Sequence, residues 1–194
     1  MQSITLIRPD DWHLHVRDDE ALAAVVPHTA ARFGRALIMP NLKPPVTTPE
    51  QALAYRERIL AAVPGSRFDP LMSLYLTDRL SPDEIDRARA SGRIIAVKLY
   101  PAGATTNSDA GVTSIDKVYP VLERMEALGM VLCVHGEATG SEVDVFDREA
   151  VFAERVFWPL RVDFPRLKMV FEHVSTIEGV EAVQKAAMLY PTKT

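Results

Sequence analysis

The chain has 194 residues, of which 47% are hydrophobic and 25% are charged, and its formal net charge is −4. This composition is typical of a globular domain that buries a core, and the slight acidity provides no basic surface for nucleic acid. No apolar run reaches the ~20 residues that a membrane-spanning helix needs, no signal segment follows Met1, and a single cysteine excludes an internal disulfide, so we expect a cytoplasmic protein.

Apolar runs that are typical of strands alternate with amphipathic stretches that are typical of helices. The predicted strands cover residues 3–8, 35–40, 70–76, 94–100, 130–135 and 168–173. The predicted helices run from Gln51 to Val63, from Ser81 to Gly92, from Ser114 to Gly129, from Asp147 to Trp158 and from Thr176 to Tyr190. Strands that alternate with helices predict a parallel sheet with right-handed crossovers.

Two parallel architectures are compatible with this pattern. An open, doubly wound sheet normally carries a glycine-rich phosphate turn after its first strand, whereas this sequence has Pro9-Asp10-Asp11-Trp12-His13 there. A (β/α) barrel gathers functional side chains at the ends of several strands, and it needs eight strands and typically ~250 residues. We therefore expect a (β/α)8 TIM barrel that is truncated after about six βα units, with residues 1–194 as a single domain that is incomplete at its C-terminus.

Side chains that can bind metal lie at the ends of four predicted strands. His13 and His15 are alternate residues of an extended segment, so both can face one point. His135 and His173 end two later strands, and Lys98 lies near the end of another. Any one of them alone is better explained as a hydrogen-bonded core residue. Their recurrence at equivalent strand ends predicts a metal site.

The remaining histidine and the cysteine are interpreted as structural. His28 lies inside a helical stretch. Cys133 is on the same strand face as His135, but it lies two residues deeper, where a buried thiol is the better interpretation.

Five segments resemble the strand motifs of the dihydroorotases in the amidohydrolase superfamily. They are residues 8–18 (Arg-Pro-Asp-Asp-Trp-His-Leu-His-Val-Arg-Asp), residues 39–48, residues 98–108, residues 134–137 (Val-His-Gly-Glu) and residues 171–174 (Phe-Glu-His-Val). The resemblance covers essentially the whole chain. Because the His-x-His motif comes so early, the resemblance is to the compact, single-barrel type.

The resemblance implies a zinc-dependent hydrolase of cyclic amides. The reaction is the reversible conversion of N-carbamoyl-L-aspartate to L-dihydroorotate plus water in pyrimidine biosynthesis. His13 and His15 would bind one Zn²⁺, and His135 and His173 a second. Lys98 would bridge the two ions as a carboxylated lysine, because a lysine ammonium has three donors and no acceptor. Two metals about 3.5–4 Å apart activate water and polarise a carbonyl.

The resemblance also implies substrate contacts. They would come from His15, Arg17, Asn41, Thr105, Thr106 and His135. From spacing alone, Arg17 is better explained by an ion pair with Asp18 or Asp19. Asn41 is equally well explained as a turn residue, and the two threonines as a solvated loop. Only the resemblance favours substrate binding at these positions.

The family's general base is an aspartate of the eighth strand, and no aspartate here matches that motif. We therefore assign no catalytic acid or base, and we expect the chain alone to be a poor enzyme. The expected partners are a small-molecule substrate and, at full length, a second copy in a homodimer. One alternative is another cyclic amidohydrolase, such as a dihydropyrimidinase or allantoinase, which does not require Arg17. The other is a non-catalytic, metal-binding homologue.

Overall fold

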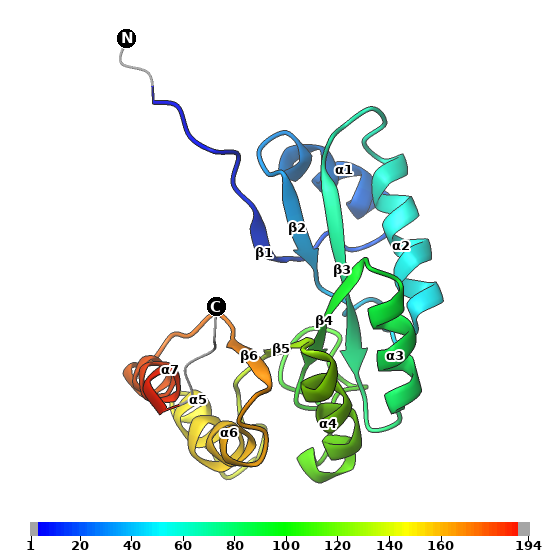
Figure 1. Ribbon diagram of the computed structural model, residues 1–194. Coiled ribbons are helices and arrows are strands. Elements are labelled where there is room, and N and C mark those ends of the chain that lie inside the picture. Colours follow the sequence, from blue (N-terminus) through cyan, green and yellow to red (C-terminus); the bar gives the residue numbers. More distant parts are fainter. Residues whose placement is uncertain (1–3, 190–194) are drawn as a thin grey trace.

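The computed structural model describes residues 4–189 of the chain. Within this range six parallel strands form one sheet in the order of the sequence. They are β1 (Asp11–Leu14), β2 (Arg35–Ile38), β3 (Asp69–Leu76), β4 (Ile94–Leu99), β5 (Val131–Val134) and β6 (Lys168–Phe171). The sheet curves, and the helices cover its convex side (Figure 1). The predicted barrel-type architecture of about six βα units is therefore confirmed.

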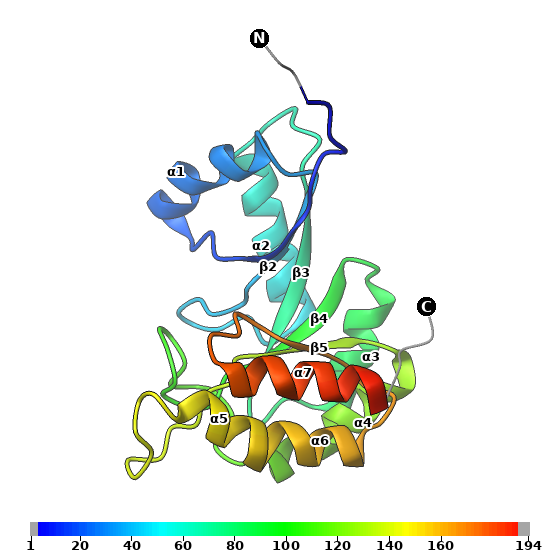
Figure 2. The ribbon, with the colours of Figure 1, turned by 90° about the vertical axis from the view of Figure 1, so that its left-hand side faces the viewer.

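A helix or a helical segment follows each strand. The helices are α1 (Asp19–Ala30), α2 (Pro49–Ala61), α3 (Pro82–Ala90), α4 (Tyr119–Leu128), α5 (Arg148–Phe152), α6 (Trp158–Asp163) and α7 (Ile177–Leu189). A 3₁₀ turn (Ile115–Val118) precedes α4, and a π-helical turn (Ala153–Phe157) joins α5 to α6. Figure 2 shows α5, α6 and α7 packed together at one end of the sheet, with α1 and α2 at the other.

The helix limits follow from local chemistry that is visible in the sequence. Thr48 caps α2: its side chain accepts from the backbone of Gln51, and the Gln51 side chain accepts from the backbone of Thr48 in return. At the end of α4, Gly129 adopts the left-handed conformation with φ 64°, which glycine adopts without a Cβ penalty. The helix predicted over 147–158 extends further, because the π-helical turn continues into α6.

The first predicted strand is wrong. Residues 4–8 are not in a strand, and Ile4, Leu6 and Ile7 are 85%, 80% and 94% exposed. The neighbouring strand β2 begins level with Asp11, so the earlier residues have no partner to pair with. Pro9 also lacks the N–H that a ladder requires. The strand instead covers Asp11–Leu14, which places His13 inside β1.

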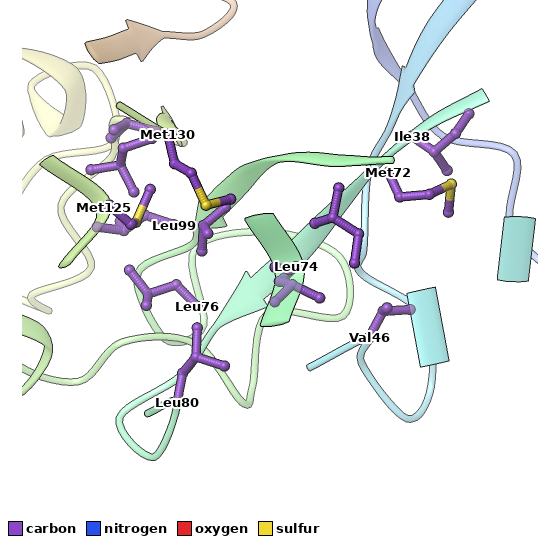
Figure 3. Close-up of a cluster of buried hydrophobic side chains, with 14 of the residues drawn as sticks. Ile38, Val46, Met72, Leu74, Leu76, Leu80, Leu99, Met125 and Met130 are labelled. Carbon is purple, nitrogen blue, oxygen red and sulfur yellow. The ribbon is translucent and has the colours of Figure 1, made fainter. Parts of the chain in front are cut away.

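The main core lies between the sheet and the helices. Strand residues that point outward, such as Ile38, Leu74 and Leu99, pack there with Met125 of α4 (Figure 3). The alternate residues of the same strands point to the concave side. That inner face holds a small apolar cluster at its base: Leu37, Met39, Leu71, Ala96 and Cys133. Lys98 is also on this inner face, because its strand neighbours Val97 and Leu99 belong to the outer core.

Candidate metal centre and substrate cavity

The five predicted metal ligands come together at the carboxyl ends of the strands. His13 lies in β1 and His15 just after it, both half-buried. His135 follows β5 and is 7% exposed, and His173 follows β6 on the exposed rim. Lys98 in β4 is fully buried beneath them. The rings of His13 and His173, from the two edge strands, have centroids 5.4 Å apart.

The imidazole nitrogens meet in two pairs. Nε2 of His13 is 3.1 Å from Nε2 of His15. Nδ1 of His135 is 3.1 Å from Nε2 of His173. Two nitrogens that bind one tetrahedral zinc at about 2.0–2.1 Å are about 3.3–3.4 Å apart. Each pair therefore has nearly the separation that a shared metal ion needs.

Three observations test whether these side chains suit a metal. Among residues 4–189, no three histidine, cysteine, aspartate or glutamate side chains converge as a finished cage. The donors are imidazoles, which zinc prefers. Nε2 of His135, the ring nitrogen that does not meet His173, is buried without a hydrogen bond, although Oε1 of Glu137 is 3.3 Å away. The donor set suits two ions held by pairs of imidazoles better than one closed site.

Three of the four histidines have lowered pKa values, which favours the neutral form that metal binding needs. Burial, together with electrostatic interaction with His13 and Arg17, lowers the pKa of His15 to about 4. Burial and the neighbouring His173 lower the pKa of His135 to about 4. The pKa of His173 is also lowered, by burial and by Lys98. These rings are neutral at pH 7, so each has a lone pair for a metal ion.

A buried glutamate that the sequence analysis did not single out completes the centre. Glu172, which follows β6, is 6% exposed and forms an ion pair with Nζ of Lys98. Its Oε1 lies 2.9 Å from Nδ1 of His13, in a bent contact. Strand alternation is the sequence signal for this residue: it follows the apolar Phe171, which packs in the outer core, so the next side chain turns inward.

Burial disfavours the charged forms of both residues, so it shifts their pKa values in opposite directions. It lowers the pKa of Lys98, and the contact with Glu172 only partly offsets this. Burial alone would raise the pKa of Glu172, but the close contact with His13 and the charge of Lys98 outweigh it and hold this pKa below its usual value. The lysine amine is thus closer to its neutral, nucleophilic form than a surface lysine is.

A cavity of about 270 Å³ opens above the histidines. Its walls include all of the predicted substrate-binding residues, and we call it the strand-end cavity. It is lined by His13, His15, Arg17, Asn41, Tyr100, Thr105, Thr106, His135, Glu137 and His173. Thr105 and Thr106 are exposed on its rim.

Among the described residues, Arg17 does not form the ion pair with Asp18 or Asp19 that the sequence suggests. Asp18 pairs with Arg58 instead, at 2.7 Å. Nη1 of Arg17 is buried and has no hydrogen-bond partner among the described residues. Arg17 has φ 58° and His173 has φ 42°. Such left-handed conformations are uncommon outside glycine and occur often at functional sites.

Asn41 links the histidines to the loop that follows β4. The residue is 2% exposed, and its Oδ1 is 2.8 Å from Nδ1 of His15. Its Nδ2 donates to the carbonyl of Thr106 at 3.0 Å, and Asn107 donates back to the Asn41 carbonyl at 2.9 Å. Asn41 is therefore more than a turn residue, since it holds both a predicted ligand and the loop.

The residues interpreted as structural are placed away from the cavity wall. His28 is exposed on α1, and its carbonyl accepts from Arg32. Cys133 is buried in the inner-face cluster. Burial and the nearby Glu172 raise its pKa to about 12, so the thiol is protonated.

No helix within residues 4–189 has the length and apolar character to cross a membrane.

Comparison with known proteins identifies the family. Residues 3–192 match the profile of the amidohydrolase family. The chain belongs to this family. The amidohydrolase chain is 75% identical over 187 residues to the dihydroorotase of Azoarcus sp., and the match covers 96% of the chain and 54% of that protein. It is 74% identical to the dihydroorotase of Aromatoleum aromaticum over 187 residues, again 96% of the chain and 54% of that protein. The chain thus spans about half the length of these relatives.

Two solved dihydroorotases and an L-hydantoinase have the same fold. The dihydroorotase of Campylobacter jejuni matches with a TM-score of 0.84 at 41% identity, over 92% of this chain and 51% of that one. The dihydroorotase of Saccharomyces cerevisiae in complex with 5-fluoroorotic acid matches with a TM-score of 0.85 at 33% identity, over 96% and 52%. The L-hydantoinase of Arthrobacter aurescens, at 19% identity and a TM-score of 0.75 over 94% and 45%, shares the fold alone.

Proposed function

We propose that this chain forms the metal-binding part of a dihydroorotase, which interconverts N-carbamoyl-L-aspartate and L-dihydroorotate plus water. The observation that carries the proposal is the meeting of imidazole nitrogens in two pairs at 3.1 Å above a buried lysine. The high identity to proteins named dihydroorotase supports the same reaction. The expected setting is a cytoplasmic homodimer that acts on a small molecule.

Two Zn²⁺ ions would occupy the centre. His13 and His15 would hold one ion, and His135 and His173 the other. When bound, the ions would supply Lewis acidity toward the substrate carbonyl and toward the attacking water. The lowered pKa values of three of these histidines support this role, because protons do not compete for their nitrogens at pH 7.

Lys98 would join the centre as a carboxylated lysine. Its neutral amine would attack the carbon of CO₂ and form an N–C bond while one C–O π bond opens onto oxygen; the proton would leave to water, and the product is a carbamate anion with two oxygens. Complete burial and a lowered pKa both favour the neutral amine that this step needs. The carbamate would then supply anionic oxygen ligands to the centre.

The substrate carboxylate would be bound by Arg17. Its unpartnered, buried Nη1 is a donor without an acceptor, and a guanidinium forms two parallel bonds with a carboxylate. Asn41 would contact the substrate by exchanging its bond to the Thr106 carbonyl. Thr105 and Thr106 would then close over the substrate from the loop. Arg17 also favours dihydroorotate over a neutral cyclic ureide, the substrate type of the alternative amidohydrolases.

A chimera tests this proposal. This chain replaces the matching part of the Azoarcus dihydroorotase, to which it is 75% identical. We expect the chimera to hydrolyse dihydroorotate at a rate close to that of the unaltered Azoarcus protein, which is the control. A folded, zinc-loaded chimera without this activity would contradict the proposal and favour a non-catalytic, metal-binding homologue.

A further inference from the structure

Glu172 contacts two groups of the proposed metal centre without being one of its predicted ligands. Oε1 is 2.9 Å from Nδ1 of His13, and Oε2 forms an ion pair with Nζ of Lys98. We propose that Glu172 is a positioning residue that holds His13 and Lys98 ready to receive metal. The proposal rests on the metal centre proposed above and adds a residue on which its assembly depends.

The contact with His13 determines which ring nitrogen is available to a metal. A carboxylate oxygen 2.9 Å from Nδ1 favours the tautomer that carries its proton there, which leaves the lone pair of His13 on Nε2. Nε2 of His13 is the atom that faces His15 at 3.1 Å. His15 is held in the same way, because its Nδ1 is 2.8 Å from Oδ1 of Asn41. His13 and His15 thus each have an oxygen beside Nδ1, and this contact orients Nε2 of each ring toward the other ring.

The contact with Lys98 offsets the cost of burying a lysine beneath the histidines. Lys98 is fully buried, and a lone cation in such a place is strongly destabilising. Its Nζ also lies 5.0 Å from the centre of the Tyr100 ring. The carboxylate of Glu172 supplies the opposite charge, so the lysine can remain beneath the histidines before any metal or carbamate is present.

The position of Glu172 in the fold gives these contacts a structural effect. β1 and β6 are the two edge strands of the described sheet, and β4 lies between them. Glu172 follows β6 and contacts β1 through His13 and β4 through Lys98. One side chain therefore links both edges of the open sheet at the level of the histidines.

Glu149 provides a matched control within the same region. It is also a buried carboxylate, 7% exposed, at the start of α5. It accepts from the backbone N–H groups of Ser175 and Thr176 and from both hydroxyls. These contacts fix the segment that leads into α7, and they touch neither a predicted ligand nor the strand-end cavity.

The first experiment compares zinc affinity in Glu172→Gln, Glu149→Gln and the unaltered chain. Zinc is titrated against a chromophoric chelator, and the folded fraction is measured for each protein. We expect Glu172→Gln to weaken zinc binding by about 10- to 100-fold, the usual effect of losing a residue that orients a ligand. Glu149→Gln should lower the unfolding temperature without changing the zinc affinity of folded molecules. Equal zinc affinities of folded Glu172→Gln and the unaltered chain would overturn the proposal, as would an equal loss in Glu149→Gln.

A second experiment needs no metal and remains decisive if Glu172→Gln unfolds easily. Thermal unfolding is measured in excess chelator for Glu172→Gln, Lys98→Met and the double variant. We expect the double variant to be more stable than Glu172→Gln alone, because the second change removes the unpaired buried charge. Strictly additive effects would overturn the pairing. If the unaltered chain binds no zinc, the proposed function fails, while this cycle still decides the role of Glu172 toward Lys98.

Discussion

The two faces of the curved sheet bury different kinds of side chain, although the same strands build both. On the outer face, Leu74 of β3 and Leu99 of β4 pack against the helices (Figure 3). On the inner face of the same strands, Tyr75 and Lys98 are equally buried but polar. Neighbouring residues along a strand thus face opposite sides of the sheet and have different roles. One contributes to the stability of the fold, and the next contributes to the site.

The largest effect on zinc binding is expected when one ligand is removed from each nitrogen pair. His13→Ala together with His173→Ala should abolish zinc binding, because each ion would keep a single imidazole. The helices and the outer core are untouched, so the circular dichroism spectrum should be preserved. Zinc occupancy is measured by metal analysis of the folded protein. Unchanged occupancy would count decisively against the site.

A substitution in the outer core should affect stability and leave the metal centre unchanged. Leu74 is fully buried, and Leu74→Ala should lower the free energy of unfolding by about 2–5 kcal/mol through lost burial and a cavity. Denaturant unfolding measures this loss. The molecules that remain folded should bind zinc as tightly as the unaltered chain. A matching loss of zinc affinity would show that the two faces are not independent.

Gly136 is a point where the two faces meet. It follows the predicted ligand His135, and a Cβ there would be 1.8 Å from the ring of Phe171, which belongs to the outer core. That ring stacks on Phe157 with centroids 5.1 Å apart, so it has little room to move. Gly136→Ala should cost about 1–3 kcal/mol of unfolding free energy and also displace His135. Thermal unfolding that matches the unaltered protein would contradict this packing.

The smallest expected effect concerns the cavity wall rather than either face. In the chimera with the Azoarcus dihydroorotase, Arg17→Lys keeps the charge but loses the planar pair of donors. Dihydroorotate turnover should fall at least about tenfold, since a hydrogen bond to a charged group contributes about 1.5–3 kcal/mol. Hydrolysis of a neutral cyclic ureide serves as the control. Equal losses on both substrates would mean that Arg17 has only a structural role.

Much of the fold is predictable because hydrophobic periodicity is a local property. β2 to β6 lie within a few residues of their predicted ranges, and the cap at Thr48 is where the sequence places it. The first strand was misplaced because Ile4, Leu6 and Ile7 have the apolar character of a strand. Whether they pair depends on where β2 begins, which is a long-range property of the fold.

The site was predictable as far as strand ends determine it. The carboxyl ends of parallel strands lie at one edge of the sheet, and the barrel curvature brings that edge together, so the convergence of the histidines follows from the predicted architecture. The partners of these residues do not follow from local sequence. Glu172 contacts Lys98 across 74 positions. Asp18 pairs with Arg58 across 40 positions rather than with its neighbour Arg17.

The two-ion centre is tested most directly by locating zinc in crystals of the folded protein by anomalous diffraction at the zinc edge. We expect two peaks, one between the rings of His13 and His15 and the other between those of His135 and His173. We also expect density for a carbamate on Nζ of Lys98 that reaches both peaks. Zinc-soaked crystals with no peak at either pair, or an unmodified lysine beside two fully occupied ions, would contradict the proposed centre.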